Sequence, residues 1–408
     1  MKRNLLGSLA LAVGSLVVFL GLLELFAARA ESELPEWLSR RNPLTDTGID
    51  VPDPDLFWRY RANADLLGSY PLEGTHQPNP IRVTTNAFGL RDRKRTREKP
   101  PGVFRILSLG ESTTFGDKLD ATESYSYRLE EILNADPSLG RPVEVWNCGI
   151  PAYSTYQSLR WLQLDGLGFQ PDLVLFYHEI NDFLPTYYRT GDGRSLGLGR
   201  TDRELGAARR RVGPLIAVLE RSHFYRWLRI RILIAASRGL AEAETSPPPA
   251  MGGDPATPYD EVVKRRFPWK TLPREATGSS GWPDTLSYME NPNPQCRVPD
   301  PDRRALLTEL IDTLQSRKID LVLIHPAYEL SRPHRCVLTE LAREKGVPFV
   351  EMERIVRKPG LPKSALYLDI YHPTGFVHRL LADELARVVR PRIPASGDSA
   401  SMAASPSP

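Results

Sequence analysis

Apolar runs of strand length, each followed by a short polar turn, recur along the chain and constrain its fold more than any other feature. A helical pattern near 122–134 separates the first two runs. Strands that alternate with helices build a parallel sheet with helices on both faces, and ligands bind at the carboxyl ends of its strands. The sequence therefore predicts an α/β fold with a closing helix at 375–389. The expected strands lie near 103–109, 143–147, 172–177, 319–325 and 347–350.

Ser112 follows the first apolar run, where a strand is expected to turn into a helix. Gly110 supplies a flexible joint, and a helix that begins near Thr113 puts Ser112 at its N-terminus, where backbone N–H groups favour an oxyanion. Serine is a weak nucleophile, so an imidazole must accept its proton and a carboxylate must orient that imidazole. Asp369 and His372 lie three residues apart on a late loop and fit these two roles.

Four short motifs resemble, in the same order, the sequence blocks of the SGNH/GDSL hydrolase family. Each follows a strand-like run, and the resemblance covers residues 103–190 and 319–390. It implies a three-layer α/β/α, flavodoxin-like domain that acts through a serine nucleophile and an acyl-serine intermediate. The matching segments are Gly110-Glu111-Ser112, Asn147-Cys148-Gly149-Ile150-Pro151, Glu179-Ile180-Asn181-Asp182 and Asp369-Ile370-Tyr371-His372-Pro373.

The resemblance also implies a role for each site residue. Ser112 is the expected nucleophile, His372 the base and Asp369 the residue that orients it. The backbone N–H groups of Ser112 and Gly149 and the side-chain amide of Asn181 are expected to form the oxyanion hole. The structural alternatives are that Ser112 is a helix N-cap and His372 a surface histidine. Asn181 and Gly149 could likewise be turn residues.

Two glutamates depart from the family's pattern. Glu111 replaces the usual aspartate beside the nucleophile, keeps its charge and adds one methylene, so we expect it to alter packing more than chemistry. Glu179 replaces the usual glycine two residues before Asn181. Its side chain could narrow the pocket, bind a sugar hydroxyl or point to solvent. Asp182 is expected to be structural.

Competing motifs fail on spacing. His178 and Glu179 begin like a zinc-binding His-Glu-x-x-His helix, but Asp182 stands where the second histidine belongs. The segment from Gly110 to Lys118 has its glycines one residue too far apart for a phosphate-binding loop. No Gly-x-Ser-x-Gly elbow surrounds the candidate serine. The sequence therefore predicts neither a metal site nor an organic cofactor.

The N-terminus carries a candidate membrane anchor. Lys2 and Arg3 precede an uncharged, mostly apolar run of nineteen residues over 5–23, which as a helix is about 28 Å long, close to the thickness of a bilayer core. Basic residues before the run keep the N-terminus cytoplasmic, so we expect a single-pass anchor through residues 5–26 and an extracytoplasmic domain. The alternative is a signal peptide cleaved near Ala30 and a secreted protein.

Composition divides the rest of the chain. The arginine-rich stretch 203–238 has apolar spacing that suits core-packing helices with a solvated basic face, or a lid or membrane-surface segment. Trp37, Trp58 and Tyr60 are expected packing or interface anchors. The predicted parts are a cytoplasmic tip and anchor at 1–30, a juxtamembrane linker at 31–100, a hydrolase domain at 101–394 with an insertion at 191–300, and a disordered tail at 395–408.

Charge and cysteine content exclude some classes of protein. A net charge of +3 gives no case for nucleic-acid binding. The hydrophobic fraction of 41% and charged fraction of 25% are those of a globular domain. Cys296 and Cys336 could form a disulfide outside the cytoplasm, whereas Cys148 is expected to be a small buried side chain.

The expected function is that of a membrane-anchored serine esterase. An extracytoplasmic compartment offers O-acetyl or other short acyl groups on exported glycans, and the anchor and arginine-rich stretch make a lipid ester an alternative substrate. Acyl transfer to a sugar uses the same site as hydrolysis, so both reactions remain open. A third possibility, motivated by Glu111 and Glu179, is a non-catalytic module of the envelope that binds glycan or protein. Protein partners are not predicted.

Overall fold

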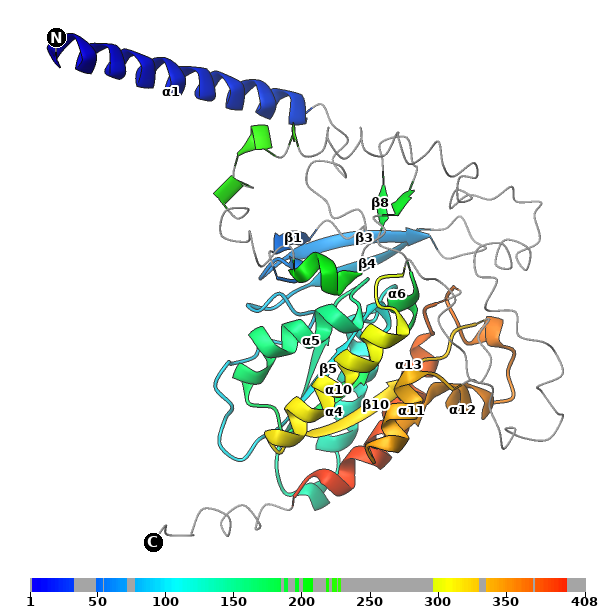
Figure 1. Ribbon diagram of the computed structural model, residues 1–408. Helices are drawn as coiled ribbons and strands as arrows, with labels where there is room; N and C mark the ends of the chain where they lie inside the picture. Colours follow the sequence, from blue (N-terminus) through cyan, green and yellow to red (C-terminus); the bar gives the residue numbers. More distant parts are fainter. Residues whose placement is uncertain are drawn as a thin grey trace, which may run out of the picture.

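A central parallel sheet organises the molecule, which we describe from a computed structural model (Figure 1). Its five strands follow the order β11-β10-β7-β5-β6, and every neighbouring pair is parallel. This is the flavodoxin-like order, and the expected α/β fold class and all five expected strands are confirmed. The strands are β5 (Phe104–Gly110), β6 (Val143–Gly149), β7 (Leu173–Tyr177), β10 (Asp320–His325) and β11 (Phe349–Glu351).

The structure describes most of the sheet domain but only parts of the segments around it. The predicted tail at 395–408 and most of the insertion at 191–300, including most of its arginine-rich stretch, lie outside the described residues. These are 2–32, 49–53, 55–71, 78–184, 187–189, 195–197, 201–207, 218–219, 222–225, 227–228, 296–329, 335–369 and 371–394.

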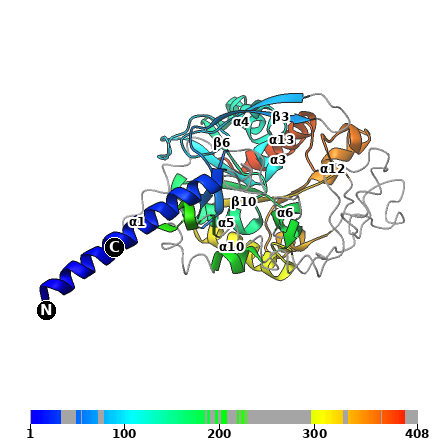
Figure 2. The same ribbon diagram turned by 90° about the horizontal axis from the view of Figure 1, so that it is seen from above.

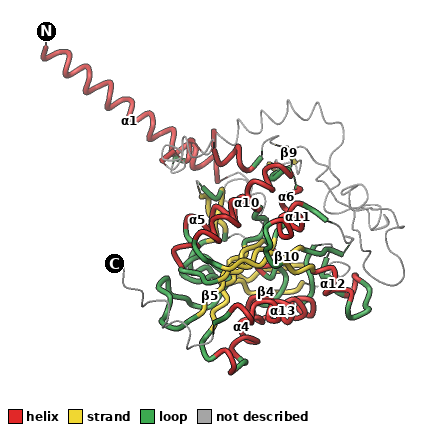
Figure 3. Tube along the Cα trace, turned by 60° about the horizontal axis from the view of Figure 1, so that its bottom comes forward, coloured by secondary structure: helices red, strands yellow, loops and turns green. Residues whose placement is uncertain are grey.

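Helices cover both faces of the sheet and complete three layers (Figure 3). Alternate strand residues face opposite layers, so Leu107 and Phe176 belong to one buried cluster, and Ile106 and Leu175 to the other. The first layer contains α5 (Thr155–Leu164), α10 (Asp300–Ser316) and α11 (Val337–Glu344), and the second contains α4 (Tyr125–Asn134), α12 (Met352–Arg357) and α13 (Gly375–Val389).

Short helices connect these elements. The helix expected near 122–134 begins at Tyr125, because Ser124 caps it by accepting a hydrogen bond from the Tyr127 N–H. Two one-turn helices follow the strands that matter most for the site, α3 (Ser112–Phe115) after β5 and α6 (Ile180–Phe183) after β7. The 3-10 turns are η1 (Ala121–Glu123), η2 (Pro137–Leu139), η3 (Gly166–Phe169), η6 (Lys363–Ala365) and η7 (Arg390–Arg392).

Two antiparallel hairpins precede the sheet in the chain. Trp58 and Tyr60 are buried, and their rings make edge contacts with Tyr153 and Phe115. Tyr153 also donates a hydrogen bond to the Trp58 carbonyl at 2.6 Å. The packing roles expected for Trp58 and Tyr60 are therefore realised, while the domain boundaries remain predictions. The hairpin strands are β1 (Asp50–Asp53), β2 (Phe57–Tyr60), β3 (Asp65–Pro71) and β4 (Pro78–Thr84), and a third hairpin joins β8 (Tyr187–Arg189) to β9 (Ser195–Gly197).

The N-terminal helix α1 (Lys2–Ser32) extends away from the α/β body (Figures 1 and 2). Its stretch Leu11–Ala30 has a mean hydropathy of 2.3 and is only 6% buried, so its length and composition would let it cross a membrane. A signal sequence near an N-terminus has the same properties. The structure thus contains a candidate span, which continues several residues beyond the apolar run identified at 5–23.

His378 joins two helices beneath the sheet edge that carries the candidate site. It lies on α13, is buried, and accepts a hydrogen bond at Nδ1 from the Tyr125 backbone N–H at 3.1 Å. Its ring stacks on Tyr125 with 5.9 Å between centroids. Burial, assisted by the positive charges of His372 and Arg91, lowers the pKa of His378 to about 3.

We expect this histidine to weaken the protein in mild acid. The unfolded chain binds a proton at His378 near its ordinary pKa of 6.5, whereas the folded protein does not until about pH 3. The free energy of unfolding therefore falls by about 1.4 kcal/mol per pH unit below pH 6.5 on this account. His378→Asn keeps an acceptor for the Tyr125 N–H, so its melting temperature should fall less than that of the wild type between about pH 6.5 and pH 4.5. Both proteins are measured in detergent. Melting temperatures that fall equally with pH in wild type and variant would contradict the assignment.

Candidate functional site

Ser112, His372 and Asp369 form a continuous chain of hydrogen bonds at the carboxyl edge of the sheet. The Ser112 Oγ lies 2.9 Å from the His372 Nε2. The His372 Nδ1 lies 2.7 Å from one Asp369 carboxylate oxygen and 2.9 Å from the other. The structure thus brings together three residues that are up to 260 positions apart in the sequence.

Local backbone geometry fixes the serine and the aspartate. Ser112 is the first residue of α3, directly after β5, and a Cβ on Gly110 would lie 1.9 Å from the Thr114 hydroxyl. Only glycine therefore lets the helix begin so close to the strand. The Asp369 carboxylate accepts the backbone N–H groups of Tyr371 at 2.7 Å and His372 at 2.8 Å, which closes the late loop around the histidine.

Two charged side chains that the sequence did not assign to the site complete it. The Lys118 ammonium forms an ion pair with Asp369, at the carboxylate oxygen that also lies 2.7 Å from the His372 Nδ1. An Asp117 carboxylate oxygen lies 3.6 Å from the His372 Nε2, the atom that also faces Ser112. The sequence signals these two residues only weakly, through the preceding Gly116, a residue type that commonly ends helices.

The neighbouring charges shift the pKa values of Asp369 and His372 in the direction opposite to that of burial. Burial raises the pKa of Asp369, but His372 and Lys118 outweigh it and hold that pKa well below its usual value. Burial lowers the pKa of His372, but Asp369 and then Asp117 outweigh it, so the pKa of His372 is raised above 6.5. The aspartate is therefore ionised at neutral pH, and the histidine gains a proton more readily than a free imidazole.

The residues expected to form the oxyanion hole lie on the strand ends next to Ser112. Gly149 ends β6 and pairs in register with Gly110, while Asn181 lies on α6 after β7. The Gly149 N–H donates to the Asn147 side-chain oxygen at 3.1 Å, and the Asn181 amide donates to the Tyr153 carbonyl at 3.1 Å. The structure thus brings these segments to one edge, with both donors already engaged by the protein.

Glu111 lies beside the nucleophile in surroundings that change its charge. Its side chain is buried and accepts a hydrogen bond from the Tyr328 hydroxyl at 3.2 Å. Burial, and next the charge of Asp182, raise the pKa of Glu111 to about 8. Glu111 is therefore largely protonated at neutral pH, which removes a negative charge from the residue beside Ser112.

Asp182 has the structural surroundings that were expected of it. It accepts hydrogen bonds from the Thr155 N–H at 2.7 Å and hydroxyl at 2.6 Å. The Arg303 guanidinium lies 3.2 Å from its carboxylate, and both side chains are fully buried. The ion pair ties α6 to α10, and the hydrogen bonds from Thr155 tie α6 to α5.

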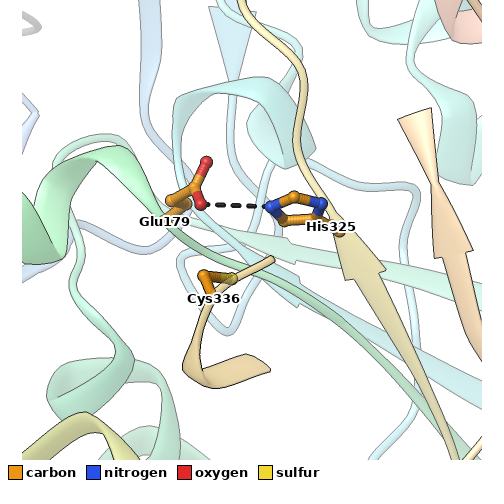
Figure 4. Close-up of side chains that lie close together, drawn as sticks. All are labelled: Glu179, His325 and Cys336. Atoms are coloured by element: carbon orange, nitrogen blue, oxygen red, sulfur yellow. Dashed lines mark hydrogen bonds and ion pairs between the residues drawn. The ribbon is translucent and has the colours of Figure 1, made fainter. Parts of the chain in front are cut away.

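Glu179 is buried and faces another strand, so the alternative that it points to solvent is wrong. Its carboxylate lies 3.2 Å from the His325 Nε2, with Cys336 beside both (Figure 4). Cys148, Cys296 and Cys336 are buried thiols, so the alternative of a Cys296–Cys336 disulfide is also wrong. Sequence reasoning missed this cluster because its three members come from separate segments with no motif spacing.

Comparisons with known proteins give structural neighbours only. No protein-family model matches the chain, and a search of curated proteins found no match. A protein described as lipolytic and of the G-D-S-L family, from Desulfitobacterium hafniense, is 10% identical with a TM-score of 0.32, and the match covers 70% of this chain and 98% of that one. An acetylxylan esterase from Geobacillus stearothermophilus is 14% identical with a TM-score of 0.38, over 71% of this chain and 94% of that one.

A third neighbour is an alpha/beta hydrolase enzyme from the metagenome of Lake Arreo, Spain. It is 12% identical with a TM-score of 0.39, and the match covers 70% of this chain and 95% of that one. At such identities and TM-scores, neither substrate nor catalytic residues can be transferred, so the chemistry has to be argued from this chain's own atoms.

Proposed function

We propose that the protein is a serine esterase with Ser112 as nucleophile, His372 as general base and Asp369 as the residue that orients the imidazole. The observation that carries this proposal is the hydrogen-bond chain from Ser112 Oγ through both nitrogens of His372 to Asp369. A serine that only capped a helix would not need an imidazole within 2.9 Å of its hydroxyl. An imidazole on a surface would not need a carboxylate held by an ammonium and two backbone N–H groups.

The reaction follows from the protonation states of these groups. Neutral His372 accepts the Ser112 proton at Nε2 while the serine oxygen attacks the ester carbonyl, and ionised Asp369 stabilises the imidazolium through Nδ1. The carbonyl oxygen becomes an oxyanion. When this tetrahedral intermediate collapses, the bond between the carbonyl carbon and the alcohol oxygen breaks, and His372 returns the proton to the leaving alcohol. Water then attacks the acyl-serine with His372 again as the base, which releases the acid and restores Ser112.

The oxyanion would rest against the N–H groups of Ser112 and Gly149 and the Asn181 amide. Ser112 supports this role because it is the first residue of α3, where N–H groups point out of the helix. The Asn181 amide has two N–H bonds, and one can hold the Tyr153 carbonyl while the other faces the oxyanion. The Gly149 N–H would have to be shared with the Asn147 side chain or released from it.

For the substrate, we propose an O-acetyl or other short acyl ester on an exported glycan or a lipid, with acyl transfer by the same site as the alternative reaction. Asp117 favours a hydroxyl-bearing substrate over an anionic one. Its carboxylate lies 3.6 Å from His372 Nε2, so it repels negative groups at the reacting end and accepts hydrogen bonds from hydroxyls. The candidate span in α1 supports a domain held outside the cytoplasm.

Removal of the nucleophile tests the proposal directly. In the full chain in detergent, p-nitrophenyl acetate should be hydrolysed faster than the octanoate, and a fluorophosphonate probe should label the protein. Ser112→Ala should abolish labelling and lower turnover by about 1,000-fold or more, because the attacking oxygen is removed. Turnover is measured by absorbance and labelling by in-gel fluorescence.

Two variants sharpen this test. Ser108→Ala removes a buried hydroxyl of β5, the strand before Ser112, that donates to the Tyr125 hydroxyl at 2.9 Å, and should keep both labelling and turnover. Asn181→Ala should keep labelling but lower kcat by about 100-fold, because it removes one oxyanion donor. A folded wild-type protein that neither reacts with the probe nor turns over ester would instead favour a non-catalytic binding module. Acyl product that forms only with an added sugar acceptor would favour the transferase.

The pH profile of the reaction should report the charge of His372. His372 must be neutral to act as a base, so kcat/KM should rise with pH through a value above 6.5, the ordinary pKa of histidine. Asp117 contributes to that raised pKa. Asp117→Asn removes its charge and should therefore shift the acid limb of the kcat/KM profile to lower pH.

The matched control is Asp120→Asn, which removes an exposed carboxylate three residues further along. It should leave the acid limb in place. An unchanged limb in Asp117→Asn, or an equal shift in both variants, would show that Asp117 does not act on His372.

A fusion protein tests on which side of the membrane the α/β domain lies. Alkaline phosphatase fused after Pro408 needs an oxidising compartment to form its disulfides, so the fusion should be active in a bacterial host if the domain lies outside the cytoplasm. The protein should remain in the membrane fraction after carbonate washing, because an uncleaved α1 holds it there. Recovery of an active, soluble protein that begins near Glu31 would instead favour a cleaved signal peptide. An inactive fusion would reject the proposed orientation.

A further inference from the structure

Three buried side chains with metal-binding chemistry converge next to the candidate oxyanion turn (Figure 4). Glu179 precedes α6, His325 ends β10 and Cys336 precedes α11. Their exposed fractions are 2%, 4% and 1%. The carboxylate, imidazole and sulfur atoms all lie within 4.8 Å of one another, and no other such group of three was found in the part of the chain that the structure describes.

We propose that Glu179, His325 and Cys336 bind one divalent transition-metal ion, for which Zn²⁺ is the best match. A thiolate ligand disfavours Mg²⁺ and Ca²⁺, which take oxygen ligands. Zinc accepts sulfur, imidazole nitrogen and carboxylate oxygen in one tetrahedral site. This proposal does not rest on the proposed esterase activity, because none of the three residues belongs to the hydrogen-bond chain at Ser112.

The geometry needs only small movements. With zinc–ligand distances of about 2.0–2.3 Å, the ligand atoms of a tetrahedral site are about 3.3–3.6 Å apart. Glu179 Oε1 and His325 Nε2 are 3.2 Å apart, so this edge of the tetrahedron already exists. The sulfur of Cys336 would close the remaining gap by rotation about its side chain. Three protein ligands leave a fourth position, which a water molecule can fill.

The backbone around the cluster holds the ligands in place. Leu175 to Tyr177 of β7 pair in register with Val322 to Ile324 of β10, so Glu179 and His325 leave the same edge of neighbouring strands. Cys336 is the N-cap of α11 and forms a capping box with Thr339. The cysteine is thus fixed at a helix N-terminus, where the positive end of the helix dipole favours a thiolate.

The charges of the cluster match those of a divalent cation. A neutral His325, ionised Glu179 and the Cys336 thiolate carry two negative charges, which one divalent ion neutralises. Arg303 of α10 is a buried cation close enough to interact with Cys336, and its charge is matched by Asp182 at 3.2 Å. The alternative without metal is an imidazolium held between a carboxylate and the thiol. That arrangement also balances, so metal content is the observation that separates the two.

A bound ion would position the turn that carries Asn181. Glu179 lies two residues before Asn181, and a metal would link this turn to β10 and α11. These residues then act as positioning residues and not as catalytic ones. The ion would hold one wall of the oxyanion site without touching the substrate.

The test measures metal in the full-length protein purified in detergent without a histidine tag. After incubation with ZnSO₄ and gel filtration, elemental analysis should give about one zinc per chain, the stoichiometry of a single mononuclear site. Cys336→Ser and Glu179→Gln should each lose that equivalent. Glu179→Gln still allows a hydrogen bond to His325, so a network without metal would tolerate it. Cys148→Ala, which removes a buried thiol whose hydrogen bond goes to the Trp146 carbonyl, should keep the zinc.

Spectroscopy on the wild type keeps the test valid if a variant fails to fold. Cobalt-substituted protein should show a thiolate-to-metal charge-transfer band and the intense d–d absorption of a tetrahedral site. X-ray absorption at the zinc edge should resolve one sulfur neighbour at about 2.3 Å with nitrogen or oxygen ligands. The proposal is overturned if folded wild type retains no zinc, if Cys336→Ser retains as much as the wild type, or if the bound zinc has no sulfur ligand.

Discussion

The close approach of α3 to the ends of β5 and β6 is the constraint on which the candidate site depends. A Cβ on Gly149 would lie 2.4 Å from the Phe115 backbone nitrogen, and one on Gly110 would lie 1.9 Å from the Thr114 hydroxyl. Two glycines paired in register therefore let a helix begin directly on the strand ends. Without that approach, the Ser112 hydroxyl would stand away from the edge that receives His372. The arrangement of the site therefore requires glycine at both positions.

Buried charge is the second organising factor, and the structure handles each carboxylate differently. Asp369 stays ionised because Lys118 and His372 face it, and Asp182 is matched by Arg303. Glu111 accepts a hydrogen bond from the Tyr328 hydroxyl instead, and burial and the charge of Asp182 keep it largely protonated. Asp369, Asp182 and Glu111 are thus each paired or protonated, while the Asp117 carboxylate lies 3.6 Å from the His372 Nε2 beside the nucleophile.

Sequence reasoning reached the parts of the fold and the site that are encoded locally. Five apolar runs gave five strands, because a strand buried on both faces has to be continuously apolar. Ser112 and the Asp369–His372 pair were recognisable because each lies in a short motif. Lys118 was not, since its partner is 251 residues away and ion pairs of that kind leave no spacing in the chain. The hairpins before the sheet were read as a linker because their polar and proline content hides the strands, although Trp58 and Tyr60 were recognised as packing residues.

Glu179 shows where the two levels of reasoning meet. The family resemblance expects glycine at this position, and the sequence alone left three fates for the larger, charged side chain. A carboxylate at the carboxyl end of a central strand is costly to bury unless a neighbouring element supplies a partner. The neighbouring strand β10 ends in His325, and the helix after it begins at Cys336, so both partners come from the same side. The departure at position 179 and the histidine and cysteine opposite it therefore form one feature, and a change of any one of the three alters the surroundings of the other two.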